Sequence, residues 1–359
     1  MLSICYLTVL RYDSLITDAI KDNVKRKYAI LTFSSHFLPF HINLSFAPQM
    51  KKFEDLRIVF FGTPDFAVAS LNALVEAGAN VVAVVTAPDK PAGRGMQLQS
   101  SAVKQYAVEK GLTVLQPEKM KSPDFLEAVK SLNADLQVVV AFRMMPVVVW
   151  DMPPMGTINV HGSLLPKYRG AAPINWAIIN GETESGVTTF KLKHEIDTGD
   201  ILLQQSVPIT STDNAGTMHD KLMAAGAELL VKTIRELASG TLHERPQSEL
   251  SATVLHAPKI FKEHLLIDWN KPVSEISNFI RGMSPYPTAY TMLGTKTMKI
   301  YTAHYDQSAH EVTSGTMQTD NATYMRFAAS DGWLYADELQ LEGKKRMNVT
   351  DFLRGFRGV

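Results

Sequence analysis

Three polar residues have types and positions that could serve one chemical step. Asn159 and His161 stand at the end of a strand expected near residues 156–160, and Asp197 lies in a tight turn after a strand expected over residues 186–192. Because side chains alternate along a strand, Asn159 and His161 should face the same side, and open α/β sheets bind ligands where their strands end. An amide, an imidazole and a carboxylate gathered there could donate hydrogen bonds to a substrate and exchange a proton with it.

Each of these residues also has a purely structural interpretation. Asn159 could cap the strand, His161 could be a core histidine with satisfied hydrogen bonds, and Asp197 could form an Asx turn. For any one residue taken alone, the structural interpretation is favoured. The hypothesis of a functional site therefore depends on the three residues acting together.

The elements around these residues predict a doubly wound, mostly parallel α/β sheet. Apolar strands alternate with helices from residue 56 onward, an order typical of a sheet covered on both faces. The strands are expected over residues 56–61, 80–86, 113–115, 136–142, 156–160, 186–192 and 201–207, and the helices over residues 65–77, 122–132, 173–180 and 214–239 and from residue 102. The sheet should occupy residues 56 to 240.

The usual nucleotide-binding and serine-hydrolase motifs are missing from the sequence. The first strand-to-helix turn, residues 62–65, has one glycine where dinucleotide-binding sheets carry several. Residues 93–95 begin a Gly-x-Gly pattern, but Leu98 stands in the place of the third glycine. The chain has neither a Gly-x-x-x-x-Gly-Lys-Ser/Thr phosphate loop nor a Gly-x-Ser-x-Gly nucleophile elbow. The sequence therefore gives no support to a dinucleotide cofactor, to phosphoryl transfer or to serine hydrolysis.

Composition indicates an ordinary packed protein without a global charge. The 359 residues suggest two domains, and 45% are hydrophobic and 20% charged. Lysines plus arginines and aspartates plus glutamates both total 36, so a polyanion would have to meet local patches. The single cysteine, Cys5, can form neither an internal disulfide nor a cysteine zinc cluster. No run reaches the ~18–20 apolar residues of a membrane span, so we expect a soluble protein. The near absence of cysteine makes the cytoplasm the default location, and a monomer is the default oligomeric state.

The first 49 residues do not share the regular pattern that follows. They show no sustained strand or helix period, and Asp13, Asp18 and Asp22 argue against a transit peptide. The regular alternation begins after Met50. The sequence therefore predicts Met50 as the natural start, with residues 1–49 a non-native or disordered extension before a domain over residues 50–240.

A second domain is expected after a polar linker. Residues 241–259 contain Pro246, Pro258 and many polar side chains, which is typical of a linker. Beyond it, a helix is expected over residues 273–281 and short strands over residues 267–269, 289–293, 297–302, 313–316, 324–328 and 332–341, a pattern that favours a small β barrel over residues 260–359. Basic and acidic residues balance there, so only patches at residues 344–346 and 354–357 could follow a phosphate backbone.

The residues around the candidate site resemble the formyltransferases that use 10-formyltetrahydrofolate. That family carries Asn-x-His, then Ser-Leu-Leu-Pro, then an Asp-x-Gly turn, and these stand here at residues 159–161, 163–166 and 197–199. The chain looks most like the branch that acts on methionine carried by tRNA, through residues 61–66, 88–95, 168–173 and 281–287. The resemblance runs from residue 56 to the C-terminus and implies a Rossmann-like formyltransferase sheet followed by an open, OB-like barrel.

The resemblance implies a reaction and a role for each polar residue. A formyl group would move from N10 of 10-formyltetrahydrofolate to the methionine α-amine, through a tetrahedral intermediate with a negative oxygen. Asn159 and a protonated His161 would donate hydrogen bonds to that oxygen, and Asp197 would bond the imidazole and help remove the amine proton. No metal is implied, because one histidine and one aspartate make a poor zinc set.

The same resemblance implies residues that bind the folate. In the family, backbone atoms of the segment after the expected strand at residues 136–142 hold the pterin ring. The implied folate-binding residues, from this segment and the Ser-Leu-Leu-Pro motif, are Phe142, Arg143, Met144, Ser163, Leu164, Leu165 and Pro166. Arg143 is a departure, since the family usually has a small residue such as glycine there, and we expect its side chain to point outward.

A tRNA partner is implied by one loop and by the barrel. Lys90 and Arg94 lie in a loop rich in proline and glycine, residues 88–101, where they could meet phosphates of the acceptor stem, although solvated charge is the alternative. Two other functions stay open. The same three polar residues could formylate a nucleotide amino-sugar or another small amine, or the chain could be a noncatalytic RNA-binding module with a degenerate folate site.

Overall fold

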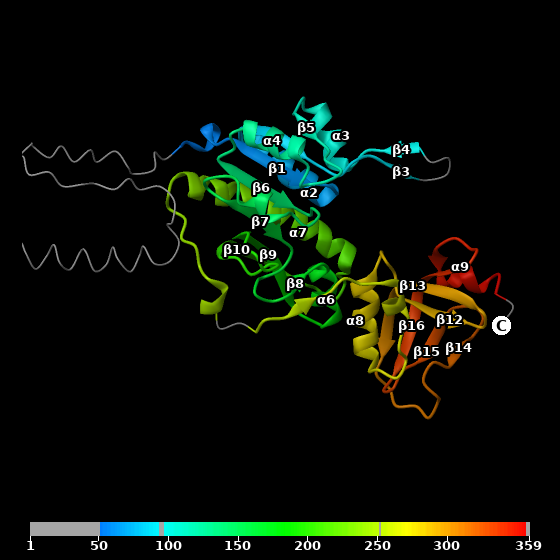
Figure 1. The fold of residues 1–359 in the computed structure, drawn as a ribbon. Helices are drawn as coiled ribbons and strands as arrows, with labels where there is room; N and C mark the ends of the chain where they lie inside the picture. The colour runs from blue at the N-terminus through cyan, green and yellow to red at the C-terminus, as the bar shows by residue number, and fades with distance from the viewer. Residues whose placement is uncertain (1–50, 93–96, 251–252, 357–359) are drawn as a thin grey trace, which may run out of the picture. The chain divides into compact units, whose positions relative to one another are not determined.

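The structure is a computed structural model that describes residues 51–92, 97–250 and 253–356 (Figure 1). The hypothesis of a non-native or disordered extension concerns residues 1–49, which lie outside the described residues. A short 3-10 helix, η1 (Phe53–Asp55), precedes the first strand. None of the helices in the described ranges combines the length and apolarity that spanning a bilayer needs.

The first part of the chain is built on a seven-stranded sheet with the order β10-β9-β7-β6-β1-β2-β5. Its strands are β1 (Ile58–Gly62), β2 (Val81–Val85), β5 (Val114–Leu115), β6 (Leu136–Val140), β7 (Thr157–His161), β9 (Glu184–Lys191) and β10 (Ile201–Pro208). All neighbouring pairs from β5 to β7 are parallel, whereas β9 runs antiparallel to both β7 and β10. The prediction of a doubly wound, mostly parallel sheet is confirmed.

Helices cover both faces of this sheet (Figure 1). They are α2 (Asp65–Glu76), α3 (Ala102–Glu109), α4 (Pro123–Ser131), α5 (Val147–Trp150), α6 (Pro173–Ile179) and α7 (Ala215–Ala238). Alternate residues of β1 belong to different cores: Ile58 and Phe60 pack with α2 and α7, and Val59 and Phe61 pack with α4 and α5. Apolar residues at every position of β1 are thus explained by burial on two sides.

A second sheet, entirely antiparallel and curled, follows with its own hydrophobic core. Its strands are β12 (Tyr290–Leu293), β13 (Lys296–Asp306), β14 (Met317–Thr319), β15 (Met325–Ala328), β16 (Trp333–Leu341) and β17 (Met347–Asn348). The 3-10 helix η3 (Lys262–Leu265) and the helices α8 (Val273–Met283) and α9 (Val349–Leu353) accompany it. The expected open, OB-like barrel is confirmed as a curled half-barrel.

Helix α8 connects this second sheet to the first part of the chain. The Asn175 amide on α6 donates to the carbonyl oxygen of Gly282 at 2.7 Å. The Arg281 guanidinium donates to the carbonyl oxygen of Asp213, just before α7, at 2.7 Å. The two parts therefore share a hydrogen-bonded boundary.

Three sequence expectations differ from the structure. Residues 90–99 were expected in a loop, but they contain β3 (Lys90–Ala92) paired with β4 (Gln97–Gln99). Residues 267–269 form no strand, because only a single bridge joins Leu266 to Tyr290. The strand expected at residues 313–316 begins later, at Met317, because Gly315 takes a φ of +85° that belongs to a turn.

The segment expected as a linker folds back onto the first sheet's loops. It contains the 3-10 helix η2 (Gln247–Glu249) and strand β11 (His256–Ala257), which pairs in parallel with β8 (Arg169–Gly170). Gly170 lies so close to β11 that a Cβ at its position would stand 2.6 Å from the Ala257 carbonyl oxygen. The segment joins the two parts of the chain and is also packed against the loop that follows β7.

Candidate active site

A cavity of about 1200 Å³ opens where β6 and β7 end. Its lining combines the segment after β6, the end of β7, the start of α6 and the turn before β10. The structure brings together six residues singled out from the sequence, which all line this cavity: Asn159, His161, Asp197, Phe142, Arg143 and Met144. The strand order explains the meeting, since β7 lies between β6 and β9.

Asn159 occupies a central place in the sheet. Its backbone pairs with Val139 of β6 on one side and Phe190 of β9 on the other. Its side chain is partly buried and makes no hydrogen bond to any other described residue. The amide is therefore a hydrogen-bond donor that the described protein leaves available inside the cavity.

The His161 ring is held by the backbone. It is 7% exposed, and its Nε2 lies 2.9 Å from the carbonyl oxygen of Tyr168. Because a carbonyl oxygen only accepts, Nε2 carries a hydrogen and Nδ1 is the nitrogen left for chemistry. Nδ1 lies 3.8 Å from Asp197 Oδ2, longer than a direct hydrogen bond and within the range of an ion pair.

Asp197 sits in an unusual backbone conformation. Its φ is +55°, in the left-handed region that few residues other than glycine adopt. Its Oδ2 accepts a hydrogen bond from the backbone N–H of Gly170 at 2.8 Å. Two residues on, a Cβ at Gly199 would come within 1.5 Å of the Lys191 carbonyl oxygen, so the turn requires glycine there. The carboxylate is thus aimed by a tightly restricted turn.

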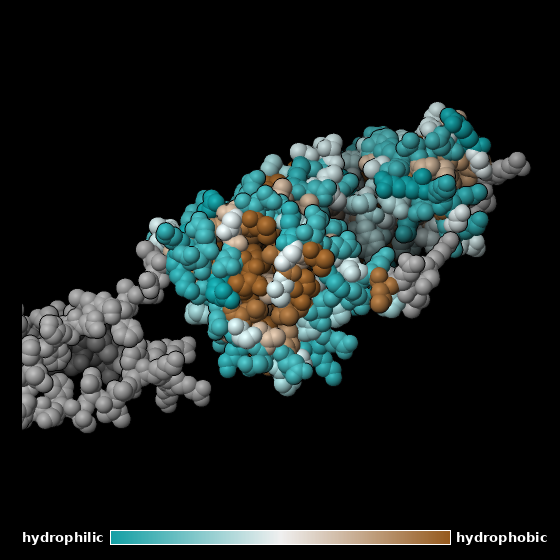
Figure 2. Space-filling model, turned by 90° about the horizontal axis from the view of Figure 1, so that it is seen from above, coloured by the Kyte–Doolittle hydropathy of each residue, from teal (hydrophilic) through white to brown (hydrophobic). Residues whose placement is uncertain are grey.

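The segment after β6 forms the apolar wall of the cavity. Ala141, directly after β6, has a φ of +46°, and Phe142 packs edge-on against Phe61 at 5.7 Å between ring centroids. Met144 lines the same wall with 78% of its surface exposed. An apolar wall of this kind is suited to the flat face of an aromatic ligand. Figure 2 shows hydrophobic residues gathered on one face of the part of the chain that holds the first sheet.

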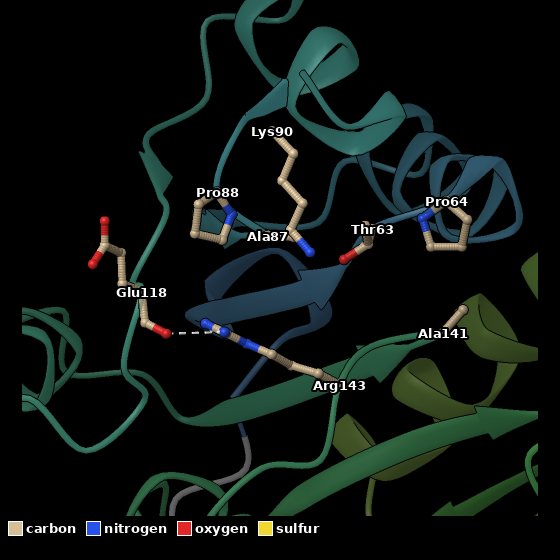
Figure 3. A pocket seen from close by; sticks show the side chains of 8 residues that line it. All are labelled: Thr63, Pro64, Ala87, Pro88, Lys90, Glu118, Ala141 and Arg143. Atoms are coloured by element: carbon tan, nitrogen blue, oxygen red, sulfur yellow. Dashed lines mark hydrogen bonds between the residues drawn. The ribbon is translucent and has the colours of Figure 1, made fainter. Parts of the chain in front are cut away.

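The Arg143 side chain is exposed and points away from the wall toward the loop at residues 117–118. Figure 3 shows its guanidinium reaching the carbonyl oxygen of Glu118, to which it donates at 3.1 Å; it also donates to the carbonyl oxygen of Pro117. The side chain crosses an adjoining cavity of about 520 Å³ whose lining includes Thr63 and Lys90. Arg143 therefore ties two loops together at the edge of the site.

The Ser-Leu-Leu-Pro residues do not reach the large cavity. Ser163 is buried and its hydroxyl donates to the Lys167 carbonyl oxygen at 2.6 Å. Leu165 packs with Phe190 and Ile201 in a small core of its own. Leu164 and Leu165 line a separate hollow of about 300 Å³, and Pro166 lines neither cavity. Ser163, Leu164, Leu165 and Pro166 are therefore outside the lining of the large cavity, and folate contact by these residues stays a prediction.

The two expected tRNA contacts have different outcomes. Lys90 begins β3 and lines the smaller cavity, with its ammonium directed into it in Figure 3. Arg94 lies outside the described residues. Lys104, another cation near this loop, is engaged by Asp89 at 2.5 Å, and hydrogen bonds from Lys104 and Gln116 lower the pKa of Asp89.

Sequence reasoning missed several residues of the site. The cavity is also lined by Asn175, Lys193, His194, Glu195 and His219. Asn175 follows the matched segment at residues 168–173 by only two positions, which is the signal that could have found it. His219 lies in the first turns of α7, a helix that was expected over residues 214–239 with no part in the site assigned to it. No group of three histidine, cysteine, aspartate or glutamate residues within the described ranges could hold a metal ion.

Comparison with known families gives this cavity its context. The formyl transferase family matches residues 56–234, and the formyl transferase C-terminal domain matches residues 259–357. The chain belongs to the formyl transferase family.

Curated relatives are similar over nearly their whole length. The chain is 57% identical over 319 residues to the methionyl-tRNA formyltransferase of Parabacteroides distasonis, covering 86% of this chain and 98% of that one. It is 53% identical to the protein of the same name in Bacteroides thetaiotaomicron, with 86% and 98% covered, and 47% identical to that of Flavobacterium johnsoniae, with 84% and 96% covered.

Solved structures share the fold at low identity. The N-formyltransferase of Helicobacter canadensis, in complex with folinic acid and dTDP-3-aminofucose, matches with a TM-score of 0.58 and 21% identity, covering 78% of this chain and 98% of that one. The sugar 3N-formyl transferase WlaRD matches with a TM-score of 0.59 and 20% identity, covering 81% and 99%. These likenesses concern the fold alone.

Proposed function

We propose that this chain transfers the formyl group of 10-formyltetrahydrofolate to the α-amine of methionyl-tRNA, which gives N-formylmethionyl-tRNA for translation initiation. The observation that carries the proposal is the convergence of Asn159, His161 and Asp197 on one cavity in a member of the formyl transferase family. Relatives named methionyl-tRNA formyltransferase, up to 57% identical, support the choice of acceptor.

The reaction begins when the amine nitrogen bonds to the formyl carbon. The carbonyl electron pair moves to oxygen, and a tetrahedral intermediate with a negative oxygen forms. Asn159 donates a hydrogen bond to this oxygen through its free amide. When the intermediate collapses, the bond between carbon and N10 breaks and N10 takes up a proton. Removing one donor of this kind typically costs roughly 10²–10³ in rate.

His161 acts through Nδ1, because its Nε2 hydrogen is committed to the Tyr168 carbonyl oxygen. In its protonated form, Nδ1 donates to the negative oxygen of the intermediate. Asp197, 3.8 Å from Nδ1, stabilises the imidazolium and accepts the proton of the attacking amine, directly or through water. In this proposal Asp197 faces the imidazole and also receives the amine proton.

The folate is held against the wall after β6. Phe142, Arg143 and Met144 supply backbone atoms and apolar surface, as the resemblance implies. Residues 163–166 shape the loop that carries Tyr168, whose carbonyl oxygen holds His161, and so they affect the site indirectly. The chemistry requires no metal, and the bound folate supplies the one-carbon unit.

Several parts of the chain bind the tRNA in this proposal. We assign residues 50–240 to the catalytic domain, residues 241–259 to the connection and residues 260–359 to a tRNA-binding domain. Lys90 and Arg94 contact the acceptor end, and the basic residues near Lys344 approach the phosphate backbone. We further propose that the protein acts as a cytoplasmic monomer.

Formyl transfer to a nucleotide amino-sugar uses the same three polar groups. The two solved relatives, one in complex with dTDP-3-aminofucose and the other a sugar 3N-formyl transferase, are only 20–21% identical to this chain, so they support the fold and not the acceptor. The acceptor is therefore better argued from the relatives at 47–57% identity.

A direct assay tests the proposal. The purified protein is given 10-formyltetrahydrofolate with either methionyl-tRNA or a dTDP-linked amino-sugar, and formylated product is measured by mass spectrometry. We expect product with methionyl-tRNA only. Product with the amino-sugar alone would establish the alternative, and no product with either would refute formyl transfer to these acceptors.

A further inference from the structure

Gln247 is a buried glutamine outside the motifs of the site. It begins η2, in the segment expected as a linker, and is 5% exposed. Its Nε2 donates to the carbonyl oxygens of Asp197, at 2.8 Å, and Gly199, at 2.9 Å. Its Oε1 accepts from Nε and Nη2 of Arg169, at 3.0 and 2.6 Å. One side chain thus makes four hydrogen bonds to the two strands of chain that meet at Asp197.

The orientation of this amide follows from the chemistry of its partners. A guanidinium only donates and a backbone carbonyl only accepts, so the oxygen faces Arg169 and the nitrogen faces the turn. Both amide hydrogens and both oxygen lone pairs are used. A side chain that makes all of its possible hydrogen bonds to protein groups is suited to holding those groups in one arrangement.

Gln247 bonds to residues on both sides of the hydrogen bond that orients the Asp197 carboxylate. Arg169 precedes Gly170, whose N–H donates to Asp197 Oδ2 at 2.8 Å. On the other side, Gln247 grips the backbone of a turn in which Asp197 takes a φ of +55°, a conformation that persists only when its surroundings enforce it. Gln247 therefore links Arg169, the residue before the donor, to the backbone of Asp197, the residue that carries the acceptor.

We propose that Gln247 is a positioning residue for formyl transfer, which holds the Asp197 carboxylate facing Nδ1 of His161. The inference rests on the proposed role of Asp197 in catalysis. It predicts that Gln247 affects the rate of the chemical step and leaves substrate binding largely alone, because its side chain lines neither cavity.

The segment that carries Gln247 is anchored independently of this side chain. The backbone N–H of Arg169 donates to the Leu255 carbonyl oxygen at 2.9 Å, and that of Ala171 donates to the Ala257 carbonyl oxygen at 2.8 Å. Substituting Gln247 should therefore release the turn at Asp197 without detaching strand β11.

Two substitutions separate the functions of the amide. Gln247→Met removes every hydrogen bond of the side chain at similar length. Gln247→Glu keeps an oxygen for Arg169 and removes both donors to the turn. We expect each variant to lower kcat about tenfold or more, with the KM for methionyl-tRNA and for 10-formyltetrahydrofolate changed less than about twofold, since displacing a reacting group by a fraction of an ångström is costly.

Gln137 offers a control of similar burial outside the cavity. It lies in β6, is 0% exposed, and its Oε1 accepts from the Thr157 hydroxyl at 3.1 Å. Gln137→Met should leave kcat within about twofold of wild type. An equal loss of kcat in Gln137→Met and Gln247→Met would mean general destabilisation and would overturn the proposal.

A double-mutant cycle with Asp197→Ala locates the effect. If Gln247 acts through Asp197, adding Gln247→Met to Asp197→Ala should lower kcat less than about twofold further. A full tenfold further loss, or unchanged kcat in both single Gln247 variants, would overturn the positioning role. A wild-type protein inactive on methionyl-tRNA would instead reject the proposed function, so the two failures are distinguishable.

Discussion

The turn around Asp197 and the curled second sheet hold their polar groups in opposite ways. At the turn, the carboxylate and its backbone are fixed by Gly170 and Gln247, and little of the side chain meets solvent. In the second sheet, Arg326 lies over the ring of Trp333, 3.9 Å from its centroid, and Arg346 lies over Tyr301 at 4.1 Å. The first arrangement fixes a carboxylate by hydrogen bonds, whereas the second lays guanidinium groups over the rings of Trp333 and Tyr301, which are themselves buried.

The surfaces of the two regions differ as well. On the face shown in Figure 2, hydrophobic residues gather on the first part of the chain, while the second sheet's side is mostly hydrophilic. The hydrogen bond from Arg346 to Glu338 raises the pKa of the guanidinium, so this cation stays charged throughout the working range of pH. Binding through the second sheet should therefore weaken as the salt concentration rises. The contacts at the turn should instead be sensitive to substitutions that change single side-chain atoms.

The largest expected effect is at the candidate catalytic residues. Asn159→Ala, His161→Ala and Asp197→Ala should each lower kcat by about 10² or more with modest changes in KM, because contacts made in the transition state are lost. Steady-state formylation kinetics measure this, with the exposed His243→Ala as control. Turnover close to wild type in all three variants would show that these residues take no part in the mechanism. The proposed functional difference between the turn and the second sheet would then be wrong.

A second buried carboxylate tests whether fixed bonding alone stabilises the fold. Asp213 is 6% exposed at its side chain and accepts hydrogen bonds from Lys221, Thr210 and Thr217. Burial would raise its pKa, but these hydrogen bonds outweigh burial and lower the pKa below its ordinary value of 3.8. Asp213→Asn should reduce the free energy of unfolding at neutral pH by about 2 kcal/mol.

The sign of its pH dependence follows from the lowered pKa. The contribution of Asp213 is complete well above pH 3.8, where the carboxylate is ionised in both the folded and the unfolded chain. Below pH 3.8 the unfolded chain binds the proton first, and the contribution is lost progressively as the pH falls toward the lowered pKa of the folded state. Denaturant titrations of wild type and Asp213→Asn should therefore converge on acidification. A difference that grows toward low pH would contradict this account.

A smaller effect is expected from the exposed cations of the second part. Replacing Lys344, Lys345 and Arg346 with serine should raise the KM for methionyl-tRNA about threefold and leave kcat unchanged. The dependence of tRNA affinity on salt should also become shallower, because fewer phosphate counterions are released. If the salt dependence of the triple variant equals that of wild type, these residues do not contact the tRNA.

The smallest expected effect is at Arg143. Arg143→Gly introduces the small residue typical of the family and removes the contacts with the carbonyl oxygens of Pro117 and Glu118. Because the side chain is exposed, we expect the KM for 10-formyltetrahydrofolate to change less than about threefold. A change above tenfold, measured at saturating methionyl-tRNA, would give Arg143 a direct part in folate binding.

The sequence predicted the sheet well because its strands are short apolar runs between turn residues. The ends of elements were less predictable. Strand β6 was expected to reach residue 142, but it ends at Val140, since Ala141 adopts a φ of +46° that no local pattern signals. The pairing of β3 with β4 was missed because Pro91 and the nearby glycines are typical of a loop.

The candidate site was predictable in outline and not in its atomic detail. Alternation along β7 was enough to place Asn159 and His161 together. It could not show which nitrogen of His161 is free, because that depends on the Tyr168 backbone carbonyl. Gln247 was missed because it lies 50 residues from Asp197, in a polar stretch without periodicity.

The pairing of β11 with β8 has a consequence for anyone exchanging barrels between relatives. A graft that joins foreign sequence directly after residue 240 would discard both Gln247 and the strand that presses on Gly170. A junction placed beyond Ala257 keeps them. In practice, the catalytic domain therefore extends well into residues 241–259, which composition alone would assign to a linker.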